Sequence, residues 1–133
     1  MTQKLNYDFL PPISGPYVHA AKHNKTLYIS GLTAFGTESQ SGGLIEQSAE
    51  ALDQISRILE HERCTKSDLI KLTIFVTDIS LLPSIREQLF TFYEGQLPAC
   101  SLVEVSKLIH PDLKIEIEAT VALSDEGCVL TPA

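Results

Sequence analysis

The chain has 133 residues, which suits one domain and is too short for two ordinary ones. Its apolar fraction of 44% is enough for a hydrophobic core without disulfides or metal. A formal net charge of -7 and the lack of any Lys/Arg cluster disfavour nucleic acid as a partner, because an acidic surface repels phosphate.

No apolar run approaches the length of a membrane span, and the N-terminal stretch MTQKLNYDFLPP has no hydrophobic signal segment. The three cysteines, Cys64, Cys100 and Cys128, cannot all pair within one chain, and their spacing matches no metal site. We therefore expect a reduced, cytoplasmic protein.

The first half of the chain predicts strands followed by a helix. The segment up to Pro12 favours an edge strand or arm, and Tyr17–Lys22 and Thr26–Ser30 are predicted strands joined by a turn at Asn24. A Gly/Ser/Thr-rich loop leads to a predicted helix over Leu44–Glu60. Its expected apolar face consists of Ile45, Ala49, Leu52, Ile55 and Leu59.

The second half predicts a strand, a helix and two strands. Apolar residues alternate with polar ones in LIKLTIFVTDI, and a helix follows over about Leu82–Tyr93, with Pro83 in its first turn. The last strands are predicted at Cys100–Lys107 and Leu113–Leu123. This order indicates an α+β or mixed α/β domain with two helices on one face of a sheet.

The final strand has two distinct faces. Ile115, Ile117 and Ala119 point one way, and Glu116 and Glu118 point the other. The apolar row is expected to lie under the helices. The other face is either covered by another subunit or a solvated polar surface, and the sequence leaves both interpretations open.

Six motifs occur in an order that is typical of one family. They are GPYVHA at 15–20, LYISG at 27–31, Gln47, IKLTIFVTD at 70–78, LPACSLVEV at 97–105 and KIEIEA at 114–119. On these motifs the chain resembles the Rid family, also called the YjgF or L-PSP family, over nearly its whole length.

The resemblance implies a chorismate-mutase-like subunit assembled as a homotrimer with ligand clefts at the subunit interfaces. Its best-known members hydrolyse reactive enamines and imines, such as 2-aminoacrylate, to 2-keto acids and ammonia without metal or cofactor. The resemblance thus implies a small 2-keto, imino or enamino acid-like ligand. Two alternatives stay open: a non-catalytic ligand-binding or stress-linked interaction protein, and an endoribonuclease, which the acidic charge disfavours.

The resemblance also implies roles for individual residues. Glu116 would orient the attacking water, and Tyr17, Ser30 and Gly31 would help to hold the substrate. Without the resemblance, these residues read as a strand aromatic, turn chemistry and one charge in an alternating strand. His19 and His23 are not on a helix and lack a supporting carboxylate, so a metal site is not expected.

The chain departs from the family where its arginine normally binds the substrate carboxylate. The usual PARS is here PACS, which places Cys100 at the arginine position. A planar guanidinium grips both carboxylate oxygens, a contact worth roughly a few kcal/mol in a closed site. Arg86, at a position where the family commonly has asparagine, could take over this contact, or it could be a surface residue. Cys100 lacks a neighbouring base and is not expected to be a nucleophile.

Overall fold

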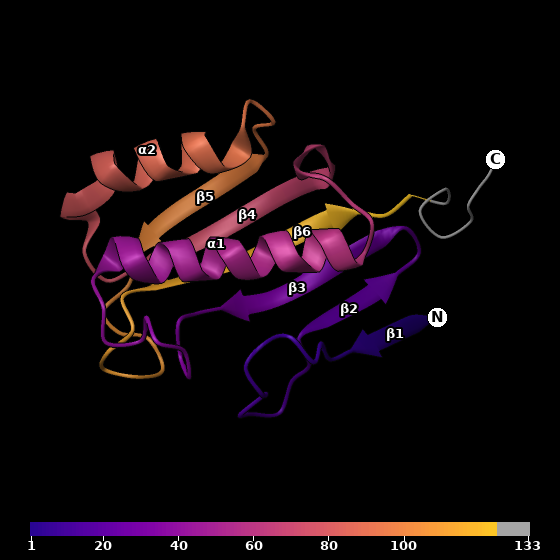
Figure 1. Ribbon diagram of the computed structural model, residues 1–133, viewed down its shortest axis with the longest axis horizontal. Helices are drawn as coiled ribbons and strands as arrows, with labels where there is room; N and C mark the ends of the chain where they lie inside the picture. The colour runs from indigo at the N-terminus through magenta and orange to yellow at the C-terminus, as the bar shows by residue number, and fades with distance from the viewer. Residues whose placement is uncertain (125–133) are drawn as a thin grey trace.

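The computed structural model describes residues 1–124, and residues 125–133, including Cys128, lie outside the described part. One six-stranded sheet has the order β1-β2-β3-β6-β4-β5 (Figure 1). Only β4 and β5 pair in parallel among these strands. The strands are β1 (Thr2–Leu5), β2 (Ala20–His23), β3 (Thr26–Leu32), β4 (Leu69–Val76), β5 (Ala99–Glu104) and β6 (Ile115–Ala122).

Two helices, α1 (Leu44–His61) and α2 (Leu82–Tyr93), cover the same face of this sheet (Figure 1). Pro83 occupies the first turn of α2, and the left-handed conformations of Glu94 and Gly95 (φ 52° and 87°) end it. The predicted α+β architecture with two helices on one sheet face is therefore confirmed. Within residues 1–124, neither helix has the length and apolar composition needed to cross a membrane.

The core lies between the sheet and the helices. The alternation predicted for β6 is present: Ile115, Ile117 and Val121 are fully buried under the helices. Glu116 and Glu118 consequently lie on the opposite face, because successive side chains of a strand point to opposite sides. None of the described helices or strands covers that face.

The prediction for the apolar face of α1 was partly wrong. Ile45 is 38% exposed and Ala49 is exposed as well, so both lie on the outer surface. The buried side of α1 contains polar residues that a hydrophobic pattern passes over, including Gln47, Ser48 and Gln54. Hydrogen bonds to the surrounding loops satisfy Gln47 and Gln54, so burial costs these amides little.

The segment before β2 also differs from its prediction as a strand. Strand β2 begins at Ala20, so Tyr17 lies in irregular chain and is 47% exposed. His19 holds this segment to the N-terminal residues: its Nδ1 accepts from the Tyr7 N–H at 2.9 Å, and its Nε2–H donates to the Pro11 carbonyl at 2.9 Å. These two bonds together require the neutral imidazole with its proton on Nε2.

Candidate functional site

The close contact between Gly31 and Glu116 organises one part of the predicted site. The pairing of β3 with β6 shifts register between Ile29 and Leu32, which brings Gly31 under the Glu116 side chain. A Cβ built at Gly31 would overlap Glu116 Oε2 and lie 2.6 Å from its Cδ. Only glycine therefore allows the Glu116 carboxyl to rest against the backbone of β3.

Ser30 and Tyr17 lie beside this contact. The Ser30 hydroxyl donates to the Val18 carbonyl at 2.7 Å, and the Ser30 N–H donates to the His19 carbonyl at 3.0 Å. The Tyr17 ring packs on Gly15, where an added Cβ would lie 2.8 Å from Tyr17 Cε1. The strand and the segment that contains Tyr17 are thus joined through Ser30.

A cavity of about 50 Å³ brings three predicted site residues together. Tyr17, Ser30 and Gly31 line it. Its wall also contains two apolar residues that no sequence motif indicated, Phe35 and Ile109, of which Ile109 is 71% exposed. No Lys, Arg, Asp or Glu of the described chain lines this cavity. We call Tyr17, Ser30, Gly31 and Glu116 the acidic half-site.

Gln47 holds the loops next to the acidic half-site in place through hydrogen bonds. Its Nε2 donates to the carbonyls of Asp112 (2.7 Å), Gln40 (2.9 Å) and Gly42 (3.2 Å), and its Oε1 accepts from the Lys114 N–H at 2.8 Å. One buried amide therefore connects the loop before α1 with the loop before β6. Lys114, in the second loop, lies two residues before Glu116 in the chain. Gln47 belongs to the family motifs in the sequence, but the sequence pattern did not show what its side chain does.

The environment of Glu116 favours its protonated form. Burial raises the pKa of the Glu116 carboxyl above its ordinary value, and the nearby Glu118 carboxylate adds to the increase. A carboxyl of this kind holds or accepts a proton more readily than an exposed glutamate, which suits a group that takes a proton from water.

Cys100 lies on the other side of the sheet, at the start of β5. It pairs with Leu72, which is fully buried under the helices, so the thiol lies on the helix-covered face. Tyr93, near the end of α2, lies beside it. Burial raises the pKa of the Cys100 thiol, although Tyr93 and the Lys71 charge oppose the increase, so the thiol stays protonated at neutral pH. This environment does not activate a nucleophile.

Arg86 lies on the exposed side of α2 and makes no hydrogen bond or ion pair within the described residues. Tyr93 lies seven positions further along the helix, a rise of about 10.5 Å. The sequence motifs did not single out Tyr93, although it shares the buried side of α2 with Ile85 and Leu89. A tyrosine beside an apolar stripe was the available signal. We call Arg86, Tyr93 and Cys100 the edge half-site.

The two half-sites of one chain do not meet. Glu116 lies at the level of Phe75 on β4, whereas Cys100 lies at the level of Leu72 and one strand further out. Two strand spacings and three residues along the sheet amount to about 14 Å, and the two side chains point to opposite faces. A small ligand within a single chain therefore contacts one half-site or the other.

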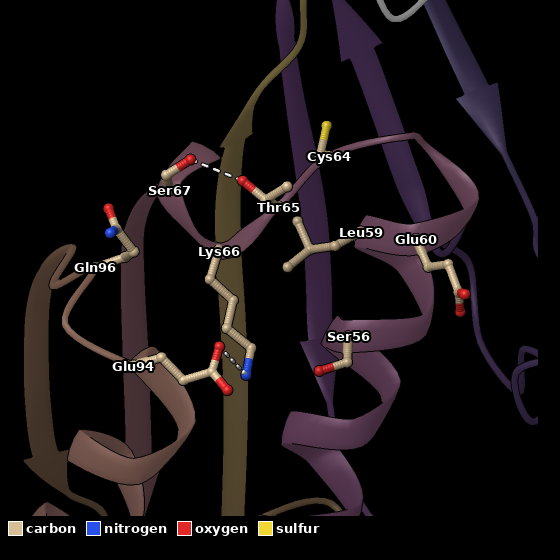
Figure 2. Close-up of a pocket in the computed structure, with 9 residues that line it drawn as sticks. All are labelled: Ser56, Leu59, Glu60, Cys64, Thr65, Lys66, Ser67, Glu94 and Gln96. Carbon is tan, nitrogen blue, oxygen red and sulfur yellow. Dashed lines mark hydrogen bonds and ion pairs between the residues drawn. The ribbon is translucent and has the colours of Figure 1, made fainter.

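A second hollow, of about 570 Å³, lies between the C-terminal ends of the two helices (Figure 2). Lys66 reaches across it to Glu94 at 3.8 Å and also lies over the Phe92 ring. Thr65 and Ser67 share a hydrogen bond of 2.7 Å at its rim. None of the predicted site residues lines this hollow.

The architecture and the Gly31–Glu116 contact define a class: an α+β subunit with two helices on a mixed sheet and an acidic group on the uncovered face. The family model described as Endoribonuclease L-PSP matches residues 10–123. The chain belongs to this family, the Rid or YjgF family.

Individual relatives agree with this assignment. The chain is 30% identical over 112 residues to the 2-iminobutanoate/2-iminopropanoate deaminase of Mus musculus, covering 82% of each chain. It is 30% identical over 124 residues to the protein of that name from Escherichia coli, covering 90% of this chain and 96% of the relative. The crystal structure of a Rid-family protein of unknown function from Yersinia pestis superposes with a TM-score of 0.83 at 26% identity, covering 92% of this chain and all of that one.

Proposed function

We propose that this chain hydrolyses small imines or enamines to a carbonyl compound and ammonia, with Glu116 orienting the attacking water. The observation that carries the proposal is the Glu116 carboxyl held against Gly31, beside a cavity lined by Tyr17 and Ser30. The relatives named as 2-iminobutanoate/2-iminopropanoate deaminases support imine hydrolysis as the reaction type.

The proposed reaction needs only water as its second reactant. Water oxygen attacks the imine carbon, the C=N π electrons move to nitrogen, and the Glu116 carboxylate takes a proton from the water. Glu116 then returns this proton to nitrogen, which gives the carbinolamine. Glu116 next passes the proton of the carbinolamine hydroxyl to nitrogen, so that the C–N bond breaks and ammonia leaves as the carbonyl forms. An enamine enters the same route after protonation at its β-carbon, which gives the iminium ion.

We infer that the working cleft forms between copies of the chain in a homotrimer. The two half-sites of one chain lie about 14 Å apart on opposite faces, so a second copy has to supply one of them to a shared ligand. Arg86 in the edge half-site would then be the cation available to a 2-keto, imino or enamino acid. Cys100 is a free, exposed thiol within the described residues, which suits a reducing cytoplasm.

A trapping assay tests the reaction. 2-Aminoacrylate is generated in situ, and pyruvate formation is followed in competition with semicarbazide. We expect the purified protein to increase pyruvate formation and Glu116→Ala to abolish the increase. Saturable binding of a 2-keto acid without acceleration would instead identify a non-catalytic binding protein.

The shared cleft has its own test. Analytical ultracentrifugation at micromolar concentration is expected to show a trimer, and a monomer at this concentration would contradict the inter-subunit cleft. Arg86→Gln is expected to weaken the binding of 2-keto acids if Arg86 contacts their carboxylate. Unchanged affinity would remove Arg86 from the site.

A further inference from the structure

Tyr93 has a buried hydroxyl that lacks a partner. The residue is 5% exposed, and its hydroxyl makes no hydrogen bond of standard geometry within the described chain. An unsatisfied buried hydroxyl costs about 1 to 3 kcal/mol, so a partner is expected in the working protein. The candidates are the neighbouring Cys100 thiol and a ligand group that reaches it.

Cys100 offers the accessible end of this pair. Its residue is exposed while its sulfur lies beside the Tyr93 hydroxyl, so the thiol can accept from Tyr93 and donate its own S–H outward. Both groups are uncharged at neutral pH, because burial raises the pKa of each. The position therefore offers neutral hydrogen-bond donors where a guanidinium would offer a fixed positive charge.

Neither Lys71 nor Arg86 changes this neutral character. Lys71 pairs with Ala99, so its side chain starts on the sheet face opposite to Cys100, although its charge influences the thiol. Arg86 lies two helical turns from Tyr93, about 10.5 Å along α2. Neither cation lies next to the Tyr93–Cys100 pair in the way that an arginine at position 100 would.

The acidic half-site is equally unsuited to an anion. Its cavity has no Lys or Arg among the described lining residues, and Phe35 and Ile109 make its wall apolar. The Glu116 carboxylate, which rests against Gly31 of the cavity lining, repels a second carboxylate, and the net charge of -7 acts in the same direction.

We propose that Tyr93 and Cys100 form a neutral hydrogen-bonding subsite, so that the cleft prefers small imines that carry no carboxylate. This subsite presupposes the imine hydrolysis proposed above and narrows its substrate class. Cys100 and Tyr93 thus determine which imine is bound, while Glu116 carries out the same attack of water on each.

Two imines that differ only in the carboxylate provide the test. A flavin amine oxidase acting on isopentylamine releases 3-methylbutan-1-imine, and a flavin amino-acid oxidase acting on leucine releases 2-imino-4-methylpentanoate. Catalase removes the peroxide, and semicarbazide competes with the protein for each imine. We expect kcat/KM at least about tenfold higher for the uncharged imine.

Variants then locate the preference. Cys100→Arg should raise kcat/KM for the 2-imino acid at least about tenfold and lower it for the uncharged imine. Tyr93→Phe should raise KM for the uncharged imine and leave kcat nearly unchanged. Lys71→Met is the matched control and should leave the preference unaltered. A wild-type preference for the 2-imino acid would overturn the neutral subsite, whether or not Arg86→Gln removes that preference.

A binding measurement separates this failure from failure of the proposed hydrolysis. Calorimetry compares 4-methylpentan-2-one with 4-methyl-2-oxopentanoate, in which a carboxylate replaces one methyl group. If neither imine is accelerated, hydrolysis is refuted, and tighter binding of the ketone still supports the neutral subsite. Tighter binding of the keto acid refutes the subsite whether or not hydrolysis occurs.

Discussion

The two half-sites are built in different ways. In the acidic half-site the backbone sets the geometry: a register shift in β3, a glycine under Glu116 and an amide network around Gln47. In the edge half-site the side chains set the chemistry, with Cys100 and Tyr93 on an outer strand and its covering helix. Under the proposed hydrolysis, the acidic half-site would therefore determine the reaction and the edge half-site would select the substrate.

The largest expected effect is that of Glu116→Gln, which removes the proton acceptor. It should lower kcat/KM about 10²- to 10⁴-fold on every imine, charged or neutral, because general-base assistance is lost. Equal losses of kcat/KM for charged and neutral imines would support a role of Glu116 in the reaction and not in substrate selection. A loss confined to one class would mean that Glu116 also selects the substrate.

The same variant should not destabilise the fold. The pKa of Glu116 is raised in the folded chain, so this group contributes stability that is fully present below its ordinary value of 4.5 and is lost as the pH rises through the folded pKa. At neutral pH an uncharged glutamine removes the cost of burying a carboxylate. Calorimetry should therefore show a small rise in Tm, of less than about 3 °C, and a lower Tm would contradict this account.

Gln47→Leu should have the next largest effect, because it breaks four hydrogen bonds and leaves buried backbone groups without partners. We expect a loss of about 3 kcal/mol, or a fall in Tm of about 10 °C. Gln88→Leu on α2 is the matched control, since Gln88 donates a single hydrogen bond, to Ile45. Its cost should stay below about 1 kcal/mol. Similar costs for the two variants would show that the acidic half-site is not specially anchored.

Gly31→Ala tests the contact between backbone and carboxyl. An added Cβ would displace the Glu116 carboxyl, and kcat should fall about 10- to 100-fold with little change in the KM for either imine. Gly43→Ala is the control, because no atom lies within 4 Å of a Cβ built there. Equal activity of the two variants would refute a role for the close approach at Gly31.

The smallest expected effect concerns Glu118, whose charge helps to raise the pKa of Glu116. Glu118→Gln should lower that pKa, so that Glu116 loses its proton at lower pH. The acid limb of the pH–rate profile should then shift to lower pH with an unchanged maximum. A shift in the opposite direction would mean that another group controls this limb.

Regular hydrophobic patterns predicted the sheet and both helices well. Strand β6 alternates strictly, and its apolar row is the one buried under the helices. The pattern misjudged α1 because the buried positions 47 and 48 are polar, and hydropathy cannot show that hydrogen bonds satisfy an amide there. The structure does not alter the sequence-based roles of Tyr17, Ser30, Arg86, Cys100 and Glu116, which stay predictions until the variants are measured.

The contacts between segments that are distant in the chain could not be predicted from the sequence. The position of Gly31 under Glu116 depends on a register shift between strands that lie more than eighty residues apart in the chain. The pairing of Tyr93 with Cys100 depends on how α2 lies across β5. Motifs named Gly31, Cys100 and Glu116, but not Tyr93, and only the fold divides these residues between two faces of the sheet.

Among the described residues, strand β5 has a neighbouring strand on one side only, so its outer row of amide and carbonyl groups has no strand partner there. A newly synthesised subunit therefore has an exposed edge strand until another chain or segment covers it. The rate of subunit synthesis thus affects the solubility of the protein in the cell. A subunit that stays unassembled is a candidate for aggregation through β5, the strand that carries Cys100.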